Sequence, residues 1–265
     1  MAGIDPMCVV DAVQAAEFRR VVHLRRNRAF PPTLAAPRYI GGSRKHCVHA
    51  FEWLPGRNLR ELSLEPDGGS GQHRHAGHLL AELHACGPGA LLPGNGQALA
   101  AAARSIADQL ACILPDAAAD ADVCARRLGR FVEDSQRNEC PVHADFYDKQ
   151  IIIGPQRPAL IDLDQARLGS AVEDLGCFVA HLEQLIICTP GLDDSRVAAL
   201  SRSLLDGYRE AGGQFAEREL AGWTAFSLFC LSREPFRDRL PHWPERVREI
   251  LARTRGLLVS AGLPA

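Results

Sequence analysis

VHADFYDKQIII, residues 142–153, and ALIDLDQARLG, residues 159–169, are the two segments of this chain that say most about its structure and chemistry. An apolar run on each side of Gly154-Pro155 predicts a β-hairpin. The hairpin brings together two short loops, which carry His143, Asp145 and Gln150, and Asp162 and Asp164. Two acidic loops beside one strand pair provide what a magnesium-dependent phosphoryl transfer needs: a carboxylate that takes or orients the acceptor proton and oxygen ligands for the cation.

The order of residues in the first loop resembles the kinase-type catalytic loop H-x-D-x-x-x-x-N. Together with I-D-L-D and the D-L-G at 174–176, it resembles the aminoglycoside phosphotransferase family, a branch of the protein-kinase-like fold. The resemblance implies that Asp145 and His143 belong to the catalytic loop, Asp145 as the base and His143 as the residue that braces the loop. It implies that Asp162 is the main Mg²⁺ ligand. Asp164 is then either a second Mg²⁺ ligand or a hydrogen-bond acceptor that does not touch the metal itself.

Gln150 stands where the kinase loop has Asn. Its amide oxygen is the same kind of ligand on a stem one carbon longer, and Mg²⁺ requires oxygens at about 2.0–2.1 Å. Gln150 can therefore hold the metal if the loop moves back. Some sugar-kinase branches of the superfamily, such as the maltokinases, are similar in using Gln there. Asp174 resembles a family Asp that ties this region together; the alternative is a first-turn carboxylate favoured by the helix dipole.

The segment HAFEWLPGRNL, residues 49–59, resembles the strand and hinge that join the two lobes of the family. That resemblance makes the main chain of Glu52, Trp53 and Leu54 a candidate site for the base of ATP or GTP. The alternative is a surface strand and turn.

The chain departs from the family before the hinge, where relatives carry a glycine-rich loop and a phosphate-binding Lys. Only Gly3, Gly41 and Gly42 precede residue 56, and no Lys precedes Lys45. Glu17 is left as a candidate for the family Glu without its Lys partner. Three explanations stay open: substitute cations from Arg19, Arg20, Arg25 and Arg26; a start upstream of Met1; or a degenerate kinase-like protein that binds but hardly catalyses. A protein partner is a further candidate source of the missing front-lobe elements.

Composition indicates an ordinary globular protein with 46% hydrophobic residues, 23% charged residues and a net charge of −2. Residues 1–45 carry eight basic and three acidic residues, a local net of +5, which leaves −7 for the remainder. No apolar run long enough to span a membrane and no signal-like start occur. Nine cysteines without a C-x-x-C pair favour reduced thiols and a cytoplasmic location.

Three other functions find less support in the sequence. His73, His75, His78 and His84 could provide zinc ligands, but no carboxylate or cysteine completes a set. A Ser-His-Asp hydrolase lacks G-x-S-x-G. Nucleic-acid binding by the front arginines has little support, because no aromatic residues are interleaved with them.

The element order read from hydrophobic periodicity predicts a two-lobed α+β fold, and the family resemblance implies that this fold is protein-kinase-like. We expect a partial front lobe with the hinge over residues 1–54 and a helical lobe with the catalytic hairpin over 55–265. In the front lobe a helix over 8–28 precedes strands near 38–40 and 46–53, with a turn at Gly41-Gly42-Ser43. A Ser170/Glu173 capping box opens one helix of the second lobe, which ends near Ile187. The other helices are expected at 73–86, 96–113, 118–135, 194–212, 215–231 and 243–260.

The sequence thus predicts a Mg²⁺-dependent transfer of the γ-phosphate of ATP or GTP to a hydroxyl of a small molecule such as an aminoglycoside, another antibiotic or a sugar. Amines of the acceptor are expected to meet acidic side chains of the helical lobe, with Glu183, Asp193, Asp194 and Glu234 as candidates.

Overall fold

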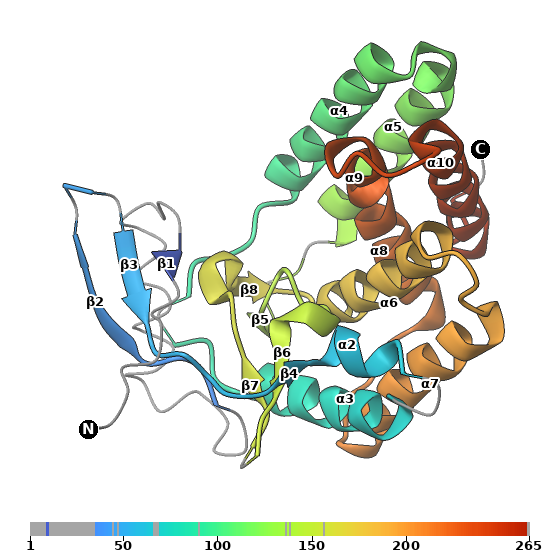
Figure 1. Cartoon of the computed structure of the whole chain (residues 1–265). Coiled ribbons are helices and arrows are strands. Elements are labelled where there is room, and N and C mark those ends of the chain that lie inside the picture. Colours follow the sequence, from blue (N-terminus) through green and yellow to red (C-terminus); the bar gives the residue numbers. More distant parts are fainter. Residues whose placement is uncertain are drawn as a thin grey trace.

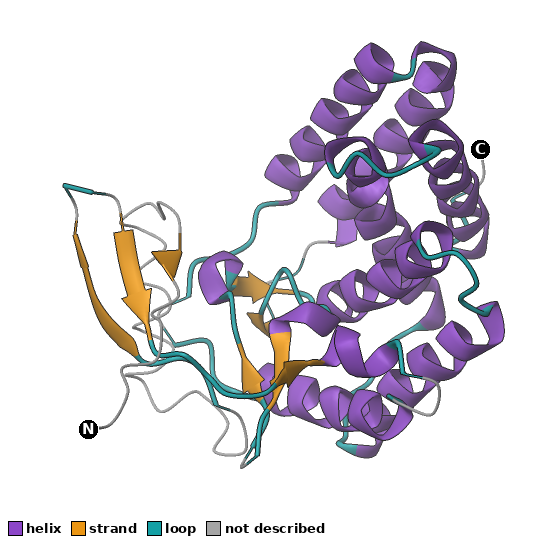
Figure 2. Cartoon of the chain, in the orientation of Figure 1, coloured by secondary structure: helices purple, strands orange, loops and turns teal. Residues whose placement is uncertain are grey.

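The computed structural model describes residues 9–10, 35–43, 45–46, 48–65, 69–89, 91–135, 137, 139–155 and 157–263. A small sheet stands apart from a large helical body, and short strand pairs lie between the two (Figure 1). Figure 2 shows the same division: the helices fill one side of the molecule, the small sheet lies on the other, and the remaining strands lie between them beside the helices. The architecture of the described residues is α+β.

The small sheet is antiparallel and contains β1 (Val9–Val10), β3 (Val48–Phe51) and β2 (Tyr39–Ser43), in that order. Two expectations were wrong here. The Gly41-Gly42-Ser43 segment is part of β2 instead of a turn, and a register shift between Tyr39 and Gly41 accommodates it. Val9 and Val10 form a strand, where a helix was expected, because β-branched residues suit the pleated pairing with β3. The remainder of the helix expected over 8–28, including its arginines and Glu17, lies outside the described residues.

Two further strand groups surround the catalytic segment. The expected hairpin is confirmed: β6 (Ile151–Ile153) pairs antiparallel with β7 (Ala159–Leu160), and β4 (Arg57–Asn58) extends the sheet beside β6. A separate pair joins β5 (Cys140–Val142) to β8 (Arg167–Gly169). Strands β4 and β8 were not expected. They are two and three residues long, too short for a period-2 pattern to show in the sequence.

The front segment is attached to the hairpin through its backbone. The Ala35 N–H donates to Pro158 O at 3.0 Å, and the Leu160 N–H donates to Ala35 O at 2.8 Å. These bonds form an isolated parallel bridge between Ala35 and Ala159. The segment that leads into β2 therefore lies against the strand that precedes Asp162.

The helical body follows the predicted periodicity closely, and the expected bounds of three helices, 96–113, 118–135 and 243–260, are reproduced. The short α2 and α9 and the 3-10 turns were not expected. The helices are α2 (Leu59–Ser63), α3 (Ser70–His84), α4 (Gly96–Ile113), α5 (Ala118–Ser135), α6 (Ala171–Cys188), α7 (Asp194–Glu210), α8 (Glu217–Cys230), α9 (Glu234–Arg237) and α10 (Trp243–Ser260). The 3-10 turns are η1 (Pro115–Ala117), η2 (Asp148–Gln150), η3 (Leu163–Gln165) and η4 (Leu231–Arg233).

Helix pairs α3/α7, α4/α5 and α6/α8 make the main packing contacts of the body. Gly77 of α3 and Gly207 of α7 allow one pair to approach closely, because a Cβ on either residue would overlap the backbone of the other helix. Phe178 of α6 and Trp223 of α8 are buried in the same core as Phe146 of the catalytic loop. This shared core fixes the loop against α6.

One local prediction at α6 was wrong. Ser170 is the N-cap residue by position, but its side chain makes no capping hydrogen bond, and Glu173 is drawn to an arginine instead. Among the described residues the cysteines are free thiols, and no helix there is both long and apolar enough to cross a bilayer.

Candidate active site

The loop expected to be catalytic, residues 143–150, follows β5 after Val142 and is fixed first by a buried carboxylate. Asp174, near the start of α6, accepts the backbone N–H groups of His143 at 2.7 Å and Ala144 at 2.8 Å. Ala144 has a φ of 66°, a left-handed conformation that costs free energy for a residue with a Cβ. The two hydrogen bonds to Asp174 offset this cost, so the loop keeps a shape that its own sequence disfavours.

Asp174 is itself held by a series of hydrogen-bonded side chains that crosses the core. His84 Nε2 lies 3.1 Å from Asp174 Oδ2, and His84 Nδ1 lies 3.0 Å from the Tyr208 hydroxyl. Burial alone would raise the pKa of Asp174, but the hydrogen bond and charge of His84 outweigh it, so the pKa is lowered. Asp174 therefore stays ionised and ties α3, α6 and α7 to the catalytic loop.

His143 braces the loop against the second acidic segment. The Asp145 N–H donates to His143 Nδ1 at 3.3 Å, so that Nε2 is the protonated nitrogen and donates to Ile161 O at 2.9 Å. The ring has no exposed surface. Of the two sequence-predicted residues of this loop, His143 is thus a positioning residue and Asp145 is the one that faces a cavity.

Three of the expected site residues come together at the centre. Gln150 Nε2 lies 3.2 Å from Asp145 Oδ2 and 3.1 Å from Asp162 Oδ2, so one amide bridges the two carboxylates. Asp162 reaches this point from a left-handed backbone conformation, with φ 58°. Burial first, and then the nearby Asp162 charge, raise the pKa of Asp145, while His143 and, more weakly, Gln150 oppose them. In this arrangement the amide nitrogen of Gln150 faces the carboxylates; a turn of the amide would bring its oxygen there instead, and carboxylate and amide oxygens are the hard ligands that suit Mg²⁺.

A cavity of about 480 Å³ opens on one side of this centre. The hinge residues Glu52, Trp53 and Leu54 line one part of it, and Gln150, Asp162 and Asp164 line another. Apolar side chains, among them Phe51, Ile152, Leu160 and Leu163, complete the walls. The cavity thus has an apolar part near the hinge and an acidic part near the central carboxylates.

The hinge residues do not offer equivalent backbone groups to this cavity. The Glu52 N–H donates to Arg38 O at 2.8 Å, and its carboxylate accepts the Arg38 N–H at 3.1 Å. Glu52 can therefore offer a ligand its carbonyl oxygen but not its N–H. The side chain of Trp53 is large and about half exposed beside it.

A second cavity, of about 420 Å³, opens on the other side of Asp145. Its walls come from the start of α4, from β8, from α6 and from the end of α8. Arg167 and Glu173 form a largely buried, two-pronged ion pair there, with Nη1 to Oε2 at 3.0 Å. Polar and sulfur-bearing lining residues include Asn95, Gln165, Cys177, His181, Ser227 and Cys230.

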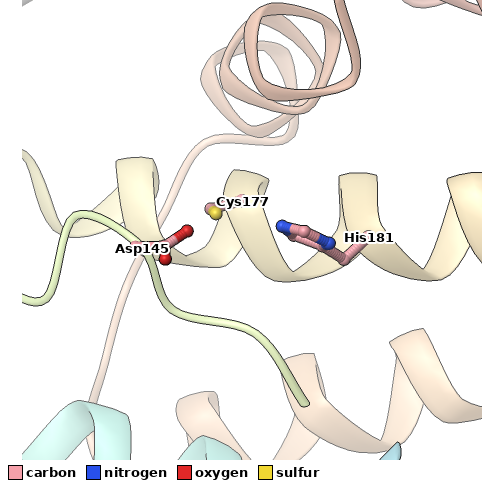
Figure 3. A group of neighbouring side chains, drawn as sticks. All are labelled: Asp145, Cys177 and His181. Atoms are coloured by element: carbon pink, nitrogen blue, oxygen red, sulfur yellow. The ribbon is translucent and has the colours of Figure 1, made fainter. Parts of the chain in front are cut away.

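Cys177 and His181 lie one helical turn apart on α6 and face Asp145 (Figure 3). The His181 ring is stacked on Tyr147, with centroids 3.8 Å apart and planes 10° from parallel. Burial lowers the pKa of His181 to about 3, raises that of Tyr147 to about 12, and raises that of Cys177 well above its usual value. All three side chains are therefore neutral at physiological pH.

Sequence reasoning did not predict this second cavity, and the residues that it proposed as acceptor contacts do not line it. The lining residues of the cavity include none of Glu183, Asp193, Asp194 and Glu234. Glu183 pairs with Arg253, Asp193 caps α7 and Glu234 pairs with Arg237. The one available signal was the i, i+4 spacing of Cys177 and His181, which puts them on one helix face, but the spacing does not say what that face meets.

The histidines considered as zinc ligands have separate partners. His73 is buried and its Nδ1 lies 2.6 Å from Gly69 O, His78 pairs with Glu210, and His84 belongs to the Asp174 chain. In the part of the chain that the structure describes, three metal-ligating side chains of the His, Cys, Asp and Glu types cluster only at Asp145, Cys177 and His181.

A buried ion pair supports the catalytic loop from α2. Arg60 Nε donates to Asp148 Oδ2, and Asp148 has no exposed surface. Asp148 begins η2, the 3-10 turn that ends at Gln150. The pair therefore connects the helix after the hinge to the turn that presents the bridging amide.

The profile of the phosphotransferase enzyme family matches residues 10–223. The chain belongs to this family, and the fold is the protein-kinase-like α+β fold that the sequence predicted. A search of curated protein sequences finds no match.

Several solved structures share the fold at low identity. A glucosamine kinase is 20% identical to this chain with a TM-score of 0.57, and the match covers 91% of this chain and 69% of the glucosamine kinase chain. A choline/ethanolamine kinase family protein from Mesorhizobium loti is 13% identical with a TM-score of 0.59, over 93% and 80%. A thermostable mutant of aminoglycoside phosphotransferase APH(4)-Ia is 15% identical with a TM-score of 0.60, over 92% and 83%.

Proposed function

We propose that the protein is a Mg²⁺-dependent kinase that transfers the γ-phosphate of ATP or GTP to a hydroxyl of a small molecule. One observation carries the proposal: Asp145 and Asp162, bridged by Gln150, lie between two cavities, one lined by the hinge and the other by helices. A phosphoryl donor and an acceptor that entered from opposite sides would meet at these carboxylates. Other members of the fold are described with ADP, one with glucosamine and one with hygromycin B.

Each residue then has a defined task on the donor side. The hinge carbonyl of Glu52 and the main chain of Trp53 and Leu54 would hold the base between apolar walls. Asp162 and Asp164 would hold Mg²⁺, together with Gln150 after its amide turns Oε1 toward the cation. The bound Mg²⁺ would supply neutralisation of charge on the transferring phosphate.

Asp145 acts on the acceptor side. The acceptor hydroxyl forms the new O–P bond while the bond from the γ-phosphorus to the bridging oxygen breaks and the nucleoside diphosphate leaves. Asp145 orients the hydroxyl and receives its proton, which then passes to solvent. Its raised pKa brings it closer to the range in which a carboxylate serves as a proton acceptor.

The charge of the second cavity narrows the acceptor class. Asp145 and Glu173 carry two negative charges and Arg167 one positive charge, which leaves a net of −1, and Glu173 is already paired. A molecule with several ammonium groups needs more carboxylates than this for its binding. We therefore favour a neutral or singly charged hydroxylated acceptor, such as a sugar, an amino sugar or an amino alcohol, over a polycationic aminoglycoside.

The test is phosphate transfer itself. Purified protein is incubated with Mg²⁺, ATP or GTP, and a panel of sugars, amino sugars, amino alcohols and aminoglycosides, and the mass gain of one phosphate is measured. Asp145→Asn should lower the rate about 10²- to 10⁴-fold. Asp108→Asn, on the exposed face of α4, is the matched control and should leave it unchanged.

Two outcomes would contradict the proposal. One is the absence of transfer to every acceptor, and the other is an Asp145→Asn variant as active as the wild type. If nucleotide and Mg²⁺ still raised the melting temperature in the first case, the protein would be a kinase-like binding protein instead of an enzyme.

A further inference from the structure

Beside Asp145, the acceptor cavity contains two possible metal ligands, Cys177 and His181, that its phosphotransferase role does not require. One carboxylate oxygen of Asp145, Sγ of Cys177 and a ring nitrogen of His181 all lie within 4.8 Å of one another. In Figure 3, Cys177 and His181 project from the same face of α6, and the Asp145 carboxylate approaches them from the neighbouring loop. All three residues line the cavity of about 420 Å³, so a solute in that cavity reaches them.

We propose that Asp145, Cys177 and His181 form a binding site for a thiophilic divalent cation such as Zn²⁺, and that its occupation shuts off phosphotransfer. The inhibitory part rests on the function proposed above, whereas cation binding stands on the geometry alone. The fourth coordination position would face the cavity and hold water.

The spacing of the three ligand atoms is close to what Zn²⁺ needs. Bonds of about 2.0–2.3 Å in a tetrahedral array place ligand atoms about 3.3–3.8 Å apart. Side-chain adjustments of about 1 Å reach that spacing from the observed cluster. Two of the ligands lie on one rigid helix, and the stacking of His181 on Tyr147 limits how far the ring can turn.

The chemistry of the set selects against Mg²⁺. Sulfur and imidazole nitrogen suit Zn²⁺, while Mg²⁺ prefers oxygen ligands in an octahedral array. His181 contributes a ring nitrogen to the cluster. The Cys177 thiol would lose its proton to solvent as the metal–sulfur bond forms, which is what a coordinated thiol does. Asp145 would therefore have oxygen-ligand chemistry on its Gln150 side and sulfur- and nitrogen-ligand chemistry on the other.

Occupation of this site would interfere with the acceptor and leave the nucleotide cavity open. The cation would lie where the acceptor hydroxyl must approach, and it would use the carboxylate that orients this hydroxyl. The hinge cavity does not include Cys177 or His181. Inhibition should therefore be competitive toward the acceptor and not toward ATP.

Cobalt provides a direct readout that does not depend on activity. Bound metal is first removed from the protein with a chelator, and the chelator is then removed. The protein is titrated with Co²⁺, and the near-ultraviolet thiolate-to-cobalt charge-transfer band is followed. We expect a saturable band at one Co²⁺ per chain, which Zn²⁺ removes. Cys177→Ser should abolish the band, and His181→Phe, which preserves the stacking partner for Tyr147, should weaken cobalt binding more than about tenfold.

Matched substitutions outside the cavity serve as controls. Cys112→Ser and His75→Phe, both at exposed positions, should retain the band of the wild type. A wild-type protein without a band, or a band that survives Cys177→Ser, would overturn the site. The wild-type result decides this even if a variant fails to fold.

The activity arm is separate. Zn²⁺ should inhibit transfer to an acceptor found in the panel, and the inhibition should be lost in Cys177→Ser when each protein is compared with its own zinc-free rate. Cobalt binding without any transfer would leave the cation site standing and contradict the kinase proposal. Transfer that is insensitive to Zn²⁺ despite cobalt binding would overturn the inhibitory role.

Discussion

The two cavities on either side of Asp145 have different origins in the chain. The hinge-side cavity is built from segments close to the sequence motifs: the hinge, the β6–β7 hairpin and the loop after β7. The acceptor-side cavity gathers residues from 93 to 231, most of them on helices. The first is mainly apolar with a cluster of acids at one end, while the second has polar and sulfur-bearing groups throughout. The proposed donor chemistry therefore follows from contiguous motifs, whereas the proposed acceptor chemistry depends on which helix faces meet.

The largest expected effect comes from Asp174, which lines neither cavity but holds the loop that carries Asp145. Asp174→Ala would leave one buried and one half-buried N–H group and His84 without their acceptor and would release the strained Ala144. We expect the free energy of unfolding to fall by about 3–5 kcal/mol, measured by urea denaturation. Asp108→Ala, on the exposed face of α4, should change it by less than about 0.5 kcal/mol. Equal stabilities of the two variants would show that the loop does not depend on Asp174.

A change confined to the donor side should separate the two cavities. Asp162→Asn removes a charge from the expected Mg²⁺ site, and the turnover rate should fall by about 10²-fold or more. Asp164→Asn should have a smaller effect, because Asp162 is the one bonded to the bridging amide. Acceptor affinity, measured by calorimetry without nucleotide, should stay near that of the wild type. A loss of acceptor affinity comparable to the loss of rate would mean that the cavities do not act separately.

A change confined to the acceptor side should weaken acceptor binding and leave nucleotide binding unchanged. Glu173→Gln keeps one oxygen for Arg167 but removes a negative charge from the cavity. The KM of a singly cationic acceptor should rise by roughly fivefold, equivalent to about 1 kcal/mol, with little change for a neutral acceptor. The KM for ATP is the internal control. A rise in the KM for ATP without a rise in the KM for the acceptor would mean that Glu173 acts on the hinge-side cavity, which would contradict the prediction.

The smallest expected effect is on the pH dependence of stability. Asp174 has a lowered pKa in the folded protein, so its contribution is fully present above the ordinary Asp pKa of about 3.9 and is lost as the pH falls through that value toward the folded pKa. The stability difference between the wild type and Asp174→Asn should therefore shrink between neutral pH and pH of about 3. Urea denaturation at both pH values measures it. A difference that grows on acidification would contradict the lowered pKa.

Prediction from the sequence succeeded where a local pattern is long enough to carry a signal. Helices of 18 residues, such as α4 and α10, have several turns of periodicity. It failed at Val9–Val10, where pairing with β3 outweighed an apolar helical stripe, and at Gly41–Ser43, where glycines extend a strand instead of turning. It also missed the Arg167–Glu173 pair, because the capping-box pattern gave Glu173 a different partner.

The sequence of residues 142–169 by itself determined the hairpin and the two acidic loops. It also determined that Asp145, Gln150 and Asp162 lie close together, because a short hairpin leaves few ways to arrange its ends. Only the tertiary structure decided what Asp145 faces across the cavity. Cys177 and His181 reach it because α6 packs on α8 and is tied to the loop through Asp174. Such long-range packing depends on side-chain fit between distant helices, which no local pattern records.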